Sequence, residues 1–382
     1  MPAEAARNES EPRHILVRGV NWLGDAVMTT PAMQRLCQRF PHAQVTLLTN
    51  EKLAQLWQQY PGLTAIETFN DRDHPWSVAR RLRSRRFDVA LILPNSPRSA
   101  LEAWLSRIPR RVGYAAPTRS WLLTEAVRPP EARPRKRSIR EVKRAIQSGR
   151  QTTSNAEPGL RVHQLYHYLE LGAVLGCDPT PVAPRLQISL DEIRAVAASF
   201  GSLCNLGSAA SSDLPAVWLG LNLSAAYGPA KKWPLERFAA VVRDTSRQMP
   251  HCRWLNFGTA SDWELGENLA ASSGAPVVNL AGKTSLRQLM ALLASCRVLL
   301  SNDSGPMHLA AALGVPVVVP FGSTSPELTG PGLPGDPRHH ILRGDAPCSP
   351  CFRRTCPIDF RCMTSIDGAS VVRAILASLG RT

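Results

Sequence analysis

The feature that most constrains this fold is the stretch from Ser301 to Pro326 with the apolar run just before it. It reads as two apolar strands joined by a helix of small residues. The first run, 298–300, ends in the turn Asn302-Asp303-Ser304-Gly305, and the second spans 315–319. Such a strand, turn and helix place free N–H groups and a helix dipole at a strand's carboxyl end, which favours a phosphate or diphosphate. The pattern is typical of parallel α/β sheets. Asp303 and Ser304 are also natural N-cap residues, so simple capping is the alternative.

Length and composition point to a two-domain globular protein. A chain of 382 residues exceeds one ordinary core, and 44% apolar content supports globular folding. No apolar run approaches the length of a transmembrane helix, and the polar first residues do not resemble a secretory signal. Nine cysteines, five of them scattered, fit a reducing compartment. We therefore expect a cytoplasmic protein.

The net charge of +15 is unevenly distributed, with a dense arginine series between residues 72 and 150. Such charge favours a polyanionic partner: nucleic acid, an acidic membrane surface or a phosphorylated glycolipid. A solvated face that keeps the protein soluble is the alternative. Aromatic residues are not interleaved with these arginines, and no nucleic-acid-binding signature is visible, so we expect no nucleic-acid partner.

Strands and helices alternate along both halves of the chain, which predicts two parallel sheets covered by helices. In the first half we expect strands at 14–17, 45–49, 88–93 and 111–114, and helices at 25–39, 52–60, 99–106 and 162–175. In the second half we expect strands at 218–223, 254–257, 277–280, 298–300 and 315–319, and helices at 234–247, 261–271 and 286–295.

These elements suggest an N-terminal domain at 13–185, a second domain at 186–366 and a C-terminal helix within 367–382. The helix, about 371–379, is expected to pack back on the first domain. Residues 129–160 combine prolines, basic residues and a polar tract, which predicts a basic flexible insertion with a transient helix near 139–146. Two such sheets would leave a cleft, and ligands bind outside strand carboxyl ends.

The first predicted strand–helix loop is Arg18-Gly19-Val20-Asn21-Trp22-Leu23-Gly24-Asp25. Its spacing is not that of a dinucleotide fingerprint. Asp25 opens the following helix, where a carboxylate could deprotonate a sugar hydroxyl, or could simply cap the helix.

A later loop carries Lys231 and Lys232 just before Pro234, which stands at a predicted helix start. The lysine pair could bind a diphosphate, or could be ordinary surface charge.

Taken together, these segments resemble the ADP-heptose–lipopolysaccharide heptosyltransferases, and within that family the heptosyltransferase II branch. The resemblance runs in the family's order from residue 15 to about 330. It rests on segments 22–28, 93–96 with 99–101, 227–234, 257–258 with Asp262 and Glu264, and 301–313.

The resemblance implies a GT-B fold, with two Rossmann-like α/β domains and the active site in the cleft. It implies an inverting transfer of heptose from ADP-heptose to a heptose of the lipid A–core acceptor. Asp25 matches the family's general base, for which an ordinary or lowered pKa would suffice at neutral pH. Lys231 matches the diphosphate-binding lysine, and the N–H groups of Ser304 and Gly305 would stabilise the leaving ADP.

Further residues follow from the same resemblance. Asp303 and His308 match residues near the donor sugar and phosphate, and Glu264 matches a carboxylate that contacts the ribose. The acceptor-side or loop candidates are Asn21, Trp22, Gly24, Asn95 and Ser96. No cofactor or metal is required. The expected partners are ADP-heptose, the lipid A–core glycolipid and the anionic inner-membrane surface.

Two features do not follow from the resemblance. The basic insertion suggests attraction to phosphorylated lipid A–core or anionic lipid, or is a solvent loop. Near the C-terminus, Cys348, Cys351, Cys356 and Cys362 form a group that could bind a structural metal. Their spacing is irregular for a zinc ribbon, so reduced or loop-stabilising thiols are the alternative.

Other functions also fit parts of the pattern. A sugar-nucleotide 2-epimerase shares the two-domain fold but would need no lipid acceptor. A related glycosyltransferase could use another glycolipid acceptor. A basic nucleic-acid-binding module is the non-enzymatic alternative.

Overall fold

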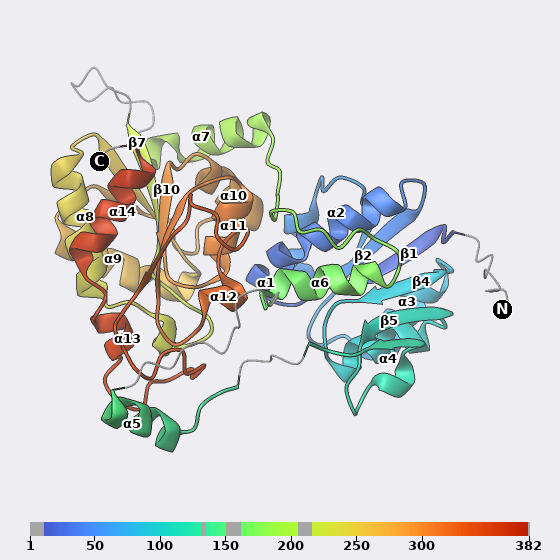
Figure 1. Ribbon diagram of the computed structural model, residues 1–382. Coiled ribbons are helices and arrows are strands. Elements are labelled where there is room, and N and C mark those ends of the chain that lie inside the picture. Colours follow the sequence, from blue (N-terminus) through green and yellow to red (C-terminus); the bar gives the residue numbers. More distant parts are fainter. Residues whose placement is uncertain (1–10, 131–134, 150–161, 205–215, 381–382) are drawn as a thin grey trace. The chain divides into compact units, whose positions relative to one another are not determined.

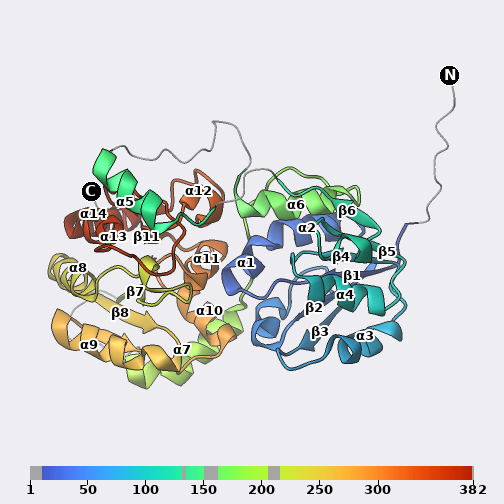
Figure 2. The same ribbon diagram turned by 90° about the horizontal axis from the view of Figure 1, so that it is seen from below.

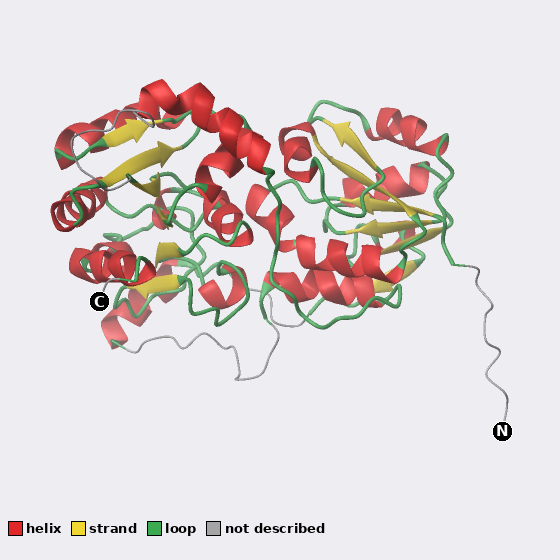
Figure 3. Cartoon of the chain, turned by 90° about the horizontal axis from the view of Figure 1, so that it is seen from above, coloured by secondary structure: helices red, strands yellow, loops and turns green. Residues whose placement is uncertain are grey.

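A computed structural model describes residues 11–130, 135–149, 162–204 and 216–380 (Figure 1). Contacts divide the chain into two compact units, each built on a six-stranded parallel sheet with helices on both faces (Figures 1 and 3). The first unit comprises Met1–Asn21, Pro31–Pro130 and His167–Thr180, and the second comprises Trp22–Thr30, Glu131–Tyr166 and Pro181–Thr382. The α/β class with two Rossmann-like sheets is confirmed, and the domain bounds given above stay predictions.

The first sheet has the strand order β3-β2-β1-β4-β5-β6, with every neighbouring pair parallel. Its central strands are continuous apolar runs, as expected where helices cover both faces. The strands are β1 (His14–Arg18), β2 (Gln44–Asn50), β3 (Ala65–Phe69), β4 (Val89–Ile92), β5 (Arg110–Tyr114) and β6 (Glu125–Val127). The edge strands β3 and β6 were not predicted.

Helices α3 (Pro75–Arg83) and α4 (Pro97–Leu105) pack together on one face of this sheet. Helices α2 (Thr30–Arg39) and α6 (Gln164–Ala173) cover the other face (Figure 2). The helix expected at 52–60 is a shorter 3-10 helix, Glu51–Trp57, and a second one spans Ser120–Leu122.

The second sheet has the order β12-β11-β10-β7-β8-β9, the same doubly wound arrangement as the first. Chain order reverses between β7 and β10, and such a switch point is where ligands of open α/β sheets bind. The strands are β7 (Val217–Asn222), β8 (Cys252–Phe257), β9 (Val277–Asn279), β10 (Val298–Ser301), β11 (Val317–Phe321) and β12 (His340–Arg343).

Two groups of helices cover the second sheet. Helices α8 (Leu235–Gln248), α9 (Trp263–Ser273) and α14 (Gly368–Ser378) lie on one face, and α8 packs against both of the others. Helices α7 (Leu190–Cys204), α10 (Leu286–Ala294) and α11 (Gly305–Ala312) pack on the other. Short helices span Pro326–Thr329 (α12) and Arg361–Thr364 (α13), and α7 was not predicted.

The expectation that the C-terminal helix packs on the first domain is wrong. Helix α14 contacts α8 and strands β10, β11 and β12 of the second unit. Val371 and Ile375 are fully buried in that unit's core, because they lie one helical turn apart on the same face.

The single helix expected at 25–39 is two helices, α1 (Leu23–Met28) and α2, which group with different units. Pro31 has no N–H to continue the helical ladder and crowds the preceding turn. The hydroxyls of Thr29 and Thr30 donate instead to the carbonyls of Ala26 and Val27, at 2.7 and 2.8 Å. This break lets α1 leave the first unit and pack on α11.

Part of the basic insertion is an ordered helix, α5 (Ile139–Ser148), which groups with the second unit. A complete capping box between Ser138 and Glu141 starts it, and Gly149 ends it in the left-handed conformation. Val142 is buried in the second unit's core, whereas Lys143 and Arg144 are exposed. The predicted helix at 139–146 is therefore present, and the polar tract of the insertion lies outside the described residues.

Among the described helices, we find none with both the length and the apolar character needed to cross a bilayer.

Candidate active site

A cavity of about 650 Å³ opens at the carboxyl ends of β7 and β10, the switch point of the second sheet. All the residues that line it belong to the second unit, because α1 groups there. The structure therefore brings eight of the predicted site residues together in this cavity: Trp22, Gly24, Asp25, Lys231, Asp303, Ser304, Gly305 and His308.

Two buried asparagines at the strand ends hold the loops of the cavity. Asn222 at the end of β7 donates to the hydroxyls of Ser301 and Ser304, at 3.1 and 2.8 Å. Asn302, after β10, accepts from the Trp233 N–H at 2.9 Å and donates to the Leu223 carbonyl at 2.7 Å. These amides tie the loop after β7 to the loop after β10, and so fix the loop that carries the site lysine.

Lys231 forms an ion pair with Asp303, with Nζ 2.6 Å from Oδ2. The pair is well buried, since the side chains are 11% and 4% exposed. Thr324, after β11, also donates to Asp303 Oδ2, at 2.5 Å. The Asp303 carboxylate is therefore held from two strands' loops and does not serve as a helix cap.

Asp25 lies in the first turn of α1 and faces the cavity. The N-cap position of α1 is Trp22, and no side chain among the described residues caps it, so the capping alternative for Asp25 is wrong. Burial raises the pKa of Asp25 to about 6, and the nearby Lys231 charge partly opposes that rise. This pKa is higher than the ordinary or lowered value that would have sufficed for a base, because loss of hydration disfavours the carboxylate.

Glycines allow α1 and α11 to pack closely. A Cβ atom added at Gly24 would lie 2.7 Å from His308 Cδ2, and one added at Gly305 would lie 2.9 Å from Leu23 Cδ2. Distances this short leave no room for a side chain. The two glycines therefore set how near Asp25 comes to the loop after β10.

His308 is buried against Gly24 and stays neutral. Burial lowers its pKa to about 3, and the neighbouring charges of His163, Lys231 and His339 act in the same direction. A neutral imidazole can donate and accept hydrogen bonds near a ligand without adding charge.

The N-terminus of α11 lines the cavity through Ser304, Gly305 and Pro306. No side chain in the described part of the chain caps this helix. The Ser304 hydroxyl, which could have done so, accepts from Asn222 instead. The first N–H groups and the positive end of the helix dipole are thus directed at the cavity, as an anion requires.

Four other predicted site residues do not line this cavity. Glu264 is exposed in the first turn of α9, and the loop after β8 contributes Phe257, Gly258 and Thr259 to the lining instead. Asn21, Asn95 and Ser96 belong to the first unit. Their roles stay predictions.

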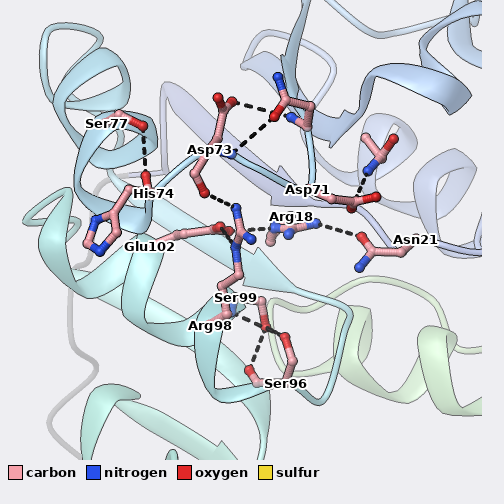
Figure 4. A network of polar contacts seen from close by, with 12 residues as sticks. Arg18, Asn21, Asp71, Asp73, His74, Ser77, Ser96, Arg98, Ser99 and Glu102 are labelled. Atoms are coloured by element: carbon pink, nitrogen blue, oxygen red, sulfur yellow. Dashed lines mark hydrogen bonds and ion pairs between the residues drawn. The ribbon is translucent and has the colours of Figure 1, made fainter.

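The first unit has its own polar network at the carboxyl end of its sheet (Figure 4). Arg18, at the end of β1, is 2% exposed and pairs with Glu102 at 2.8 Å, and it also donates to Asn21 at 3.4 Å. Arg98 pairs with the other Glu102 oxygen at 2.8 Å and remains 33% exposed. Ser96 caps α4 by accepting from the Ser99 N–H. Two guanidiniums thus share one carboxylate in this network.

The C-terminal cysteines are not grouped as metal ligands among the described residues. Among the described residues, no group of three or more His, Cys, Asp or Glu side chains could hold a metal ion. Burial raises the pKa of the Cys348, Cys351 and Cys362 thiols, that of Cys362 to about 12. These three cysteines pack in the core of the second unit, which supports the alternative of reduced, loop-stabilising thiols.

Comparison with known proteins identifies the family. The model of glycosyltransferase family 9 (heptosyltransferase) matches residues 75–360. The chain belongs to this family. Lipopolysaccharide heptosyltransferase 2 of Salmonella typhimurium is 30% identical over 83% of this chain and 85% of its own length. The enzyme of the same name from Escherichia coli is 30% identical over 87% of this chain and 91% of its own.

Solved structures agree with the family assignment. The Escherichia coli ADP-heptose LPS heptosyltransferase II structure has a TM-score of 0.72 and 25% identity, covering 96% of this chain and 98% of that one. A family 9 glycosyltransferase from Veillonella parvula has a TM-score of 0.76 at 22% identity, covering 96% and 97%, and shows the shared fold. This heptosyltransferase family member is thus a glycosyltransferase with the GT-B fold.

Because α1 and α11 pack so closely, we expect Gly24→Ala to lower the rate of sugar transfer. The added methyl group would clash with His308 and displace α1, so sugar transfer should fall by about 10- to 100-fold, because small misplacements of a catalytic group are costly. Gly172→Ala is the matched control, since its Cβ would meet Cys177 at an ordinary 3.6 Å. Equal rates for both variants would show that the packing does not position Asp25.

The raised pKa of Asp25 predicts the acid side of the pH–rate profile. A general base at Asp25 would have to be ionised, so kcat should fall as the pH drops through about 6. Lys231→Met removes the charge that opposes the rise in the Asp25 pKa, so the acid limb of the profile should move to higher pH. The control is Lys232→Met, at the exposed neighbouring residue, which should leave the acid limb unmoved. The profile is measured at saturating substrates, and an unmoved limb in Lys231→Met would contradict the assignment.

Proposed function

We propose that this glycosyltransferase moves heptose from ADP-L-glycero-D-manno-heptose to the first heptose of the lipopolysaccharide inner core, with inversion and with Asp25 as the general base. The observation that carries the proposal is the convergence of Asp25, Lys231 and the uncapped α11 N-terminus in one cavity of a family 9 chain. The relatives named heptosyltransferase 2, matched over most of their length, supply the donor and acceptor class.

In the proposed reaction, the Asp25 carboxylate takes the proton of the acceptor hydroxyl. The acceptor oxygen then attacks the anomeric carbon from the face opposite the diphosphate. The bond between that carbon and the phosphate oxygen breaks, and ADP leaves with the electron pair. A pKa of about 6 suits this role, because the carboxylate is mostly ionised at neutral pH yet more basic than an exposed aspartate.

Charge that grows on the leaving ADP would meet donors that are already in place. Lys231 provides a cation, and the N–H groups of Ser304 and Gly305 provide backbone donors with the helix dipole behind them. Neutral His308 would lie near the donor sugar. The diphosphate would contact the lysine and the backbone donors, and the proposal calls for no metal or other cofactor.

The acceptor is proposed to be the lipid A–core glycolipid, held at the carboxyl end of the first sheet by residues such as Asn21, Asn95 and Ser96. The protein would work peripherally at the cytoplasmic face of the inner membrane. Exposed basic residues of α5, among them Arg140, Lys143 and Arg144, support attraction to anionic lipid or to acceptor phosphates.

The Asp25→Asn variant tests the proposal directly. Removing the base should lower the transfer rate by about 10²- to 10⁴-fold, while ADP binding is retained because the diphosphate donors are untouched. The measurement is transfer from ADP-heptose to a mono-heptosylated core acceptor, with the highly exposed Asp191→Asn as control. Retained transfer would remove Asp25 as the base, and an epimerised nucleotide sugar as product would favour the 2-epimerase.

The basic face of α5 makes a separate prediction. Deleting the insertion would expose the core around Val142, so the test replaces Arg140, Lys143 and Arg144 by glutamine and keeps the helix. Each charge near an anionic surface is worth about 1 kcal/mol, so the acceptor KM should rise and binding to anionic vesicles should weaken, while the KM for ADP-heptose stays unchanged. The control replaces Arg243 and Arg247 of α8, whose side chains are 41% and 73% exposed. Equal effects in both variants would contradict a specific role for α5.

A further inference from the structure

The cavity is short of positive charge for a diphosphate. Among the described residues that line it, the charged side chains are Asp25, Lys231, Asp303 and Arg354. His308 adds no charge, because its pKa is about 3. Apart from Arg354, two carboxylates face a single lysine before any ligand arrives, and a diphosphate would bring further negative charge into a partly buried site. Such a charge excess is costly where water is scarce.

The Lys231 charge already interacts with carboxylates of the protein itself. Its ammonium lies 2.6 Å from Asp303 Oδ2 and also favours the ionised form of Asp25. Its charge is therefore largely balanced by those two carboxylates, and the ligand needs another cation.

Arg354 is that cation. It lines the cavity, its side chain is exposed, and no carboxylate among the described residues pairs with it. The guanidinium Cζ lies 5.4 Å from the centroid of the Tyr227 ring, and Lys231 Nζ lies 4.9 Å from the same centroid. The ring face attracts both cations, which keeps them near one another in spite of their like charge.

The backbone around Arg354 is fixed to the loop that carries Lys231. The Arg354 carbonyl accepts from the Ala230 N–H at 2.9 Å, and the Phe352 carbonyl accepts from the Tyr227 hydroxyl at 2.8 Å. Gly228, at φ +147°, allows this approach, since a Cβ there would lie 2.6 Å from the Arg354 carbonyl oxygen. Arg354 is thus presented by an ordered segment.

The same segment is anchored from its other side. The N–H groups of Cys351 and Phe352 both donate to the Ser323 carbonyl, at 3.1 and 2.7 Å. Cys348, Cys351 and Cys362 bury the segment's ends in the core. The cysteine-containing region therefore holds Arg354 at the cavity.

We propose that Arg354 binds the diphosphate of the nucleotide sugar as the second cation beside Lys231. This inference rests on the proposed function, because the ligand is the donor of that reaction. A guanidinium presents several N–H donors in a planar fork that matches phosphate oxygens, so Arg354 contributes directed hydrogen bonds as well as charge. It offsets charge on the bound donor and on the departing ADP.

The test measures binding of ADP and of adenosine by calorimetry to the full chain and to Arg354→Gln. Charge-assisted hydrogen bonds predict an ADP affinity about 10- to 100-fold weaker in Arg354→Gln, with adenosine affinity unchanged because adenosine has no phosphate. ADP binding by the variant should also depend less steeply on salt, and Arg354→Lys should recover part of the affinity. The matched control is Arg361→Gln, on the same segment but paired with Asp359 at 2.8 Å and outside the cavity lining.

The outcomes separate this inference from the proposed function. Unchanged ADP affinity in Arg354→Gln overturns the inference and leaves the function standing. An equal loss for ADP and adenosine, or a loss of the same size in Arg361→Gln, shows a structural effect and also overturns it. Failure of the unmodified chain to bind ADP overturns the proposed function and the inference together.

Discussion

The buried ion pair between Lys231 and Asp303 is the interaction on which the site depends. Burying two charges costs free energy unless their geometry is good and further hydrogen bonds satisfy them. Here Thr324 supplies a hydrogen bond to the carboxylate, and the buried amides of Asn222 and Asn302 hold the surrounding loops. The pair also determines the electrostatics of the cavity. The Lys231 charge limits the rise in the pKa of Asp25. Because Asp303 partly neutralises that charge, a bound diphosphate needs a further cation.

The two sheets share one strand order but place different chemistry at their switch points. In the second sheet the switch point carries a neutral histidine, an uncapped helix and two aspartates around a lysine. In the first sheet, the corresponding position holds Arg18 and Arg98 around Glu102. Topology thus supplies a place for ligands in each unit, and the side chains of the loops decide which ligands can bind there.

Much of the fold follows from local pattern, because buried parallel strands are continuous apolar runs and the site loops follow them. Strands without such runs were missed: β3 contains Glu67 and Thr68, and β12 alternates partly buried and exposed residues at a sheet edge. The break before Pro31 could have been found from that proline. The raised pKa of Asp25 and the position of Arg354 could not, because both arise from tertiary packing between segments far apart in sequence.

The packing of helix α1 on α11 limits how this chain could be recombined with its relatives. Helix α1 spans residues 23–28, yet its partner surface, α11, comes after residue 300. The second compact unit is therefore assembled from three separate stretches of chain. A chimera joined anywhere between the two helices would inherit Asp25, the proposed general base, from one parent and the surface of α11 on which its helix packs from the other. When halves are exchanged among relatives, Gly24 from one parent must therefore still fit against His308 from the other. This requirement holds even when the junction lies far from both residues in the sequence.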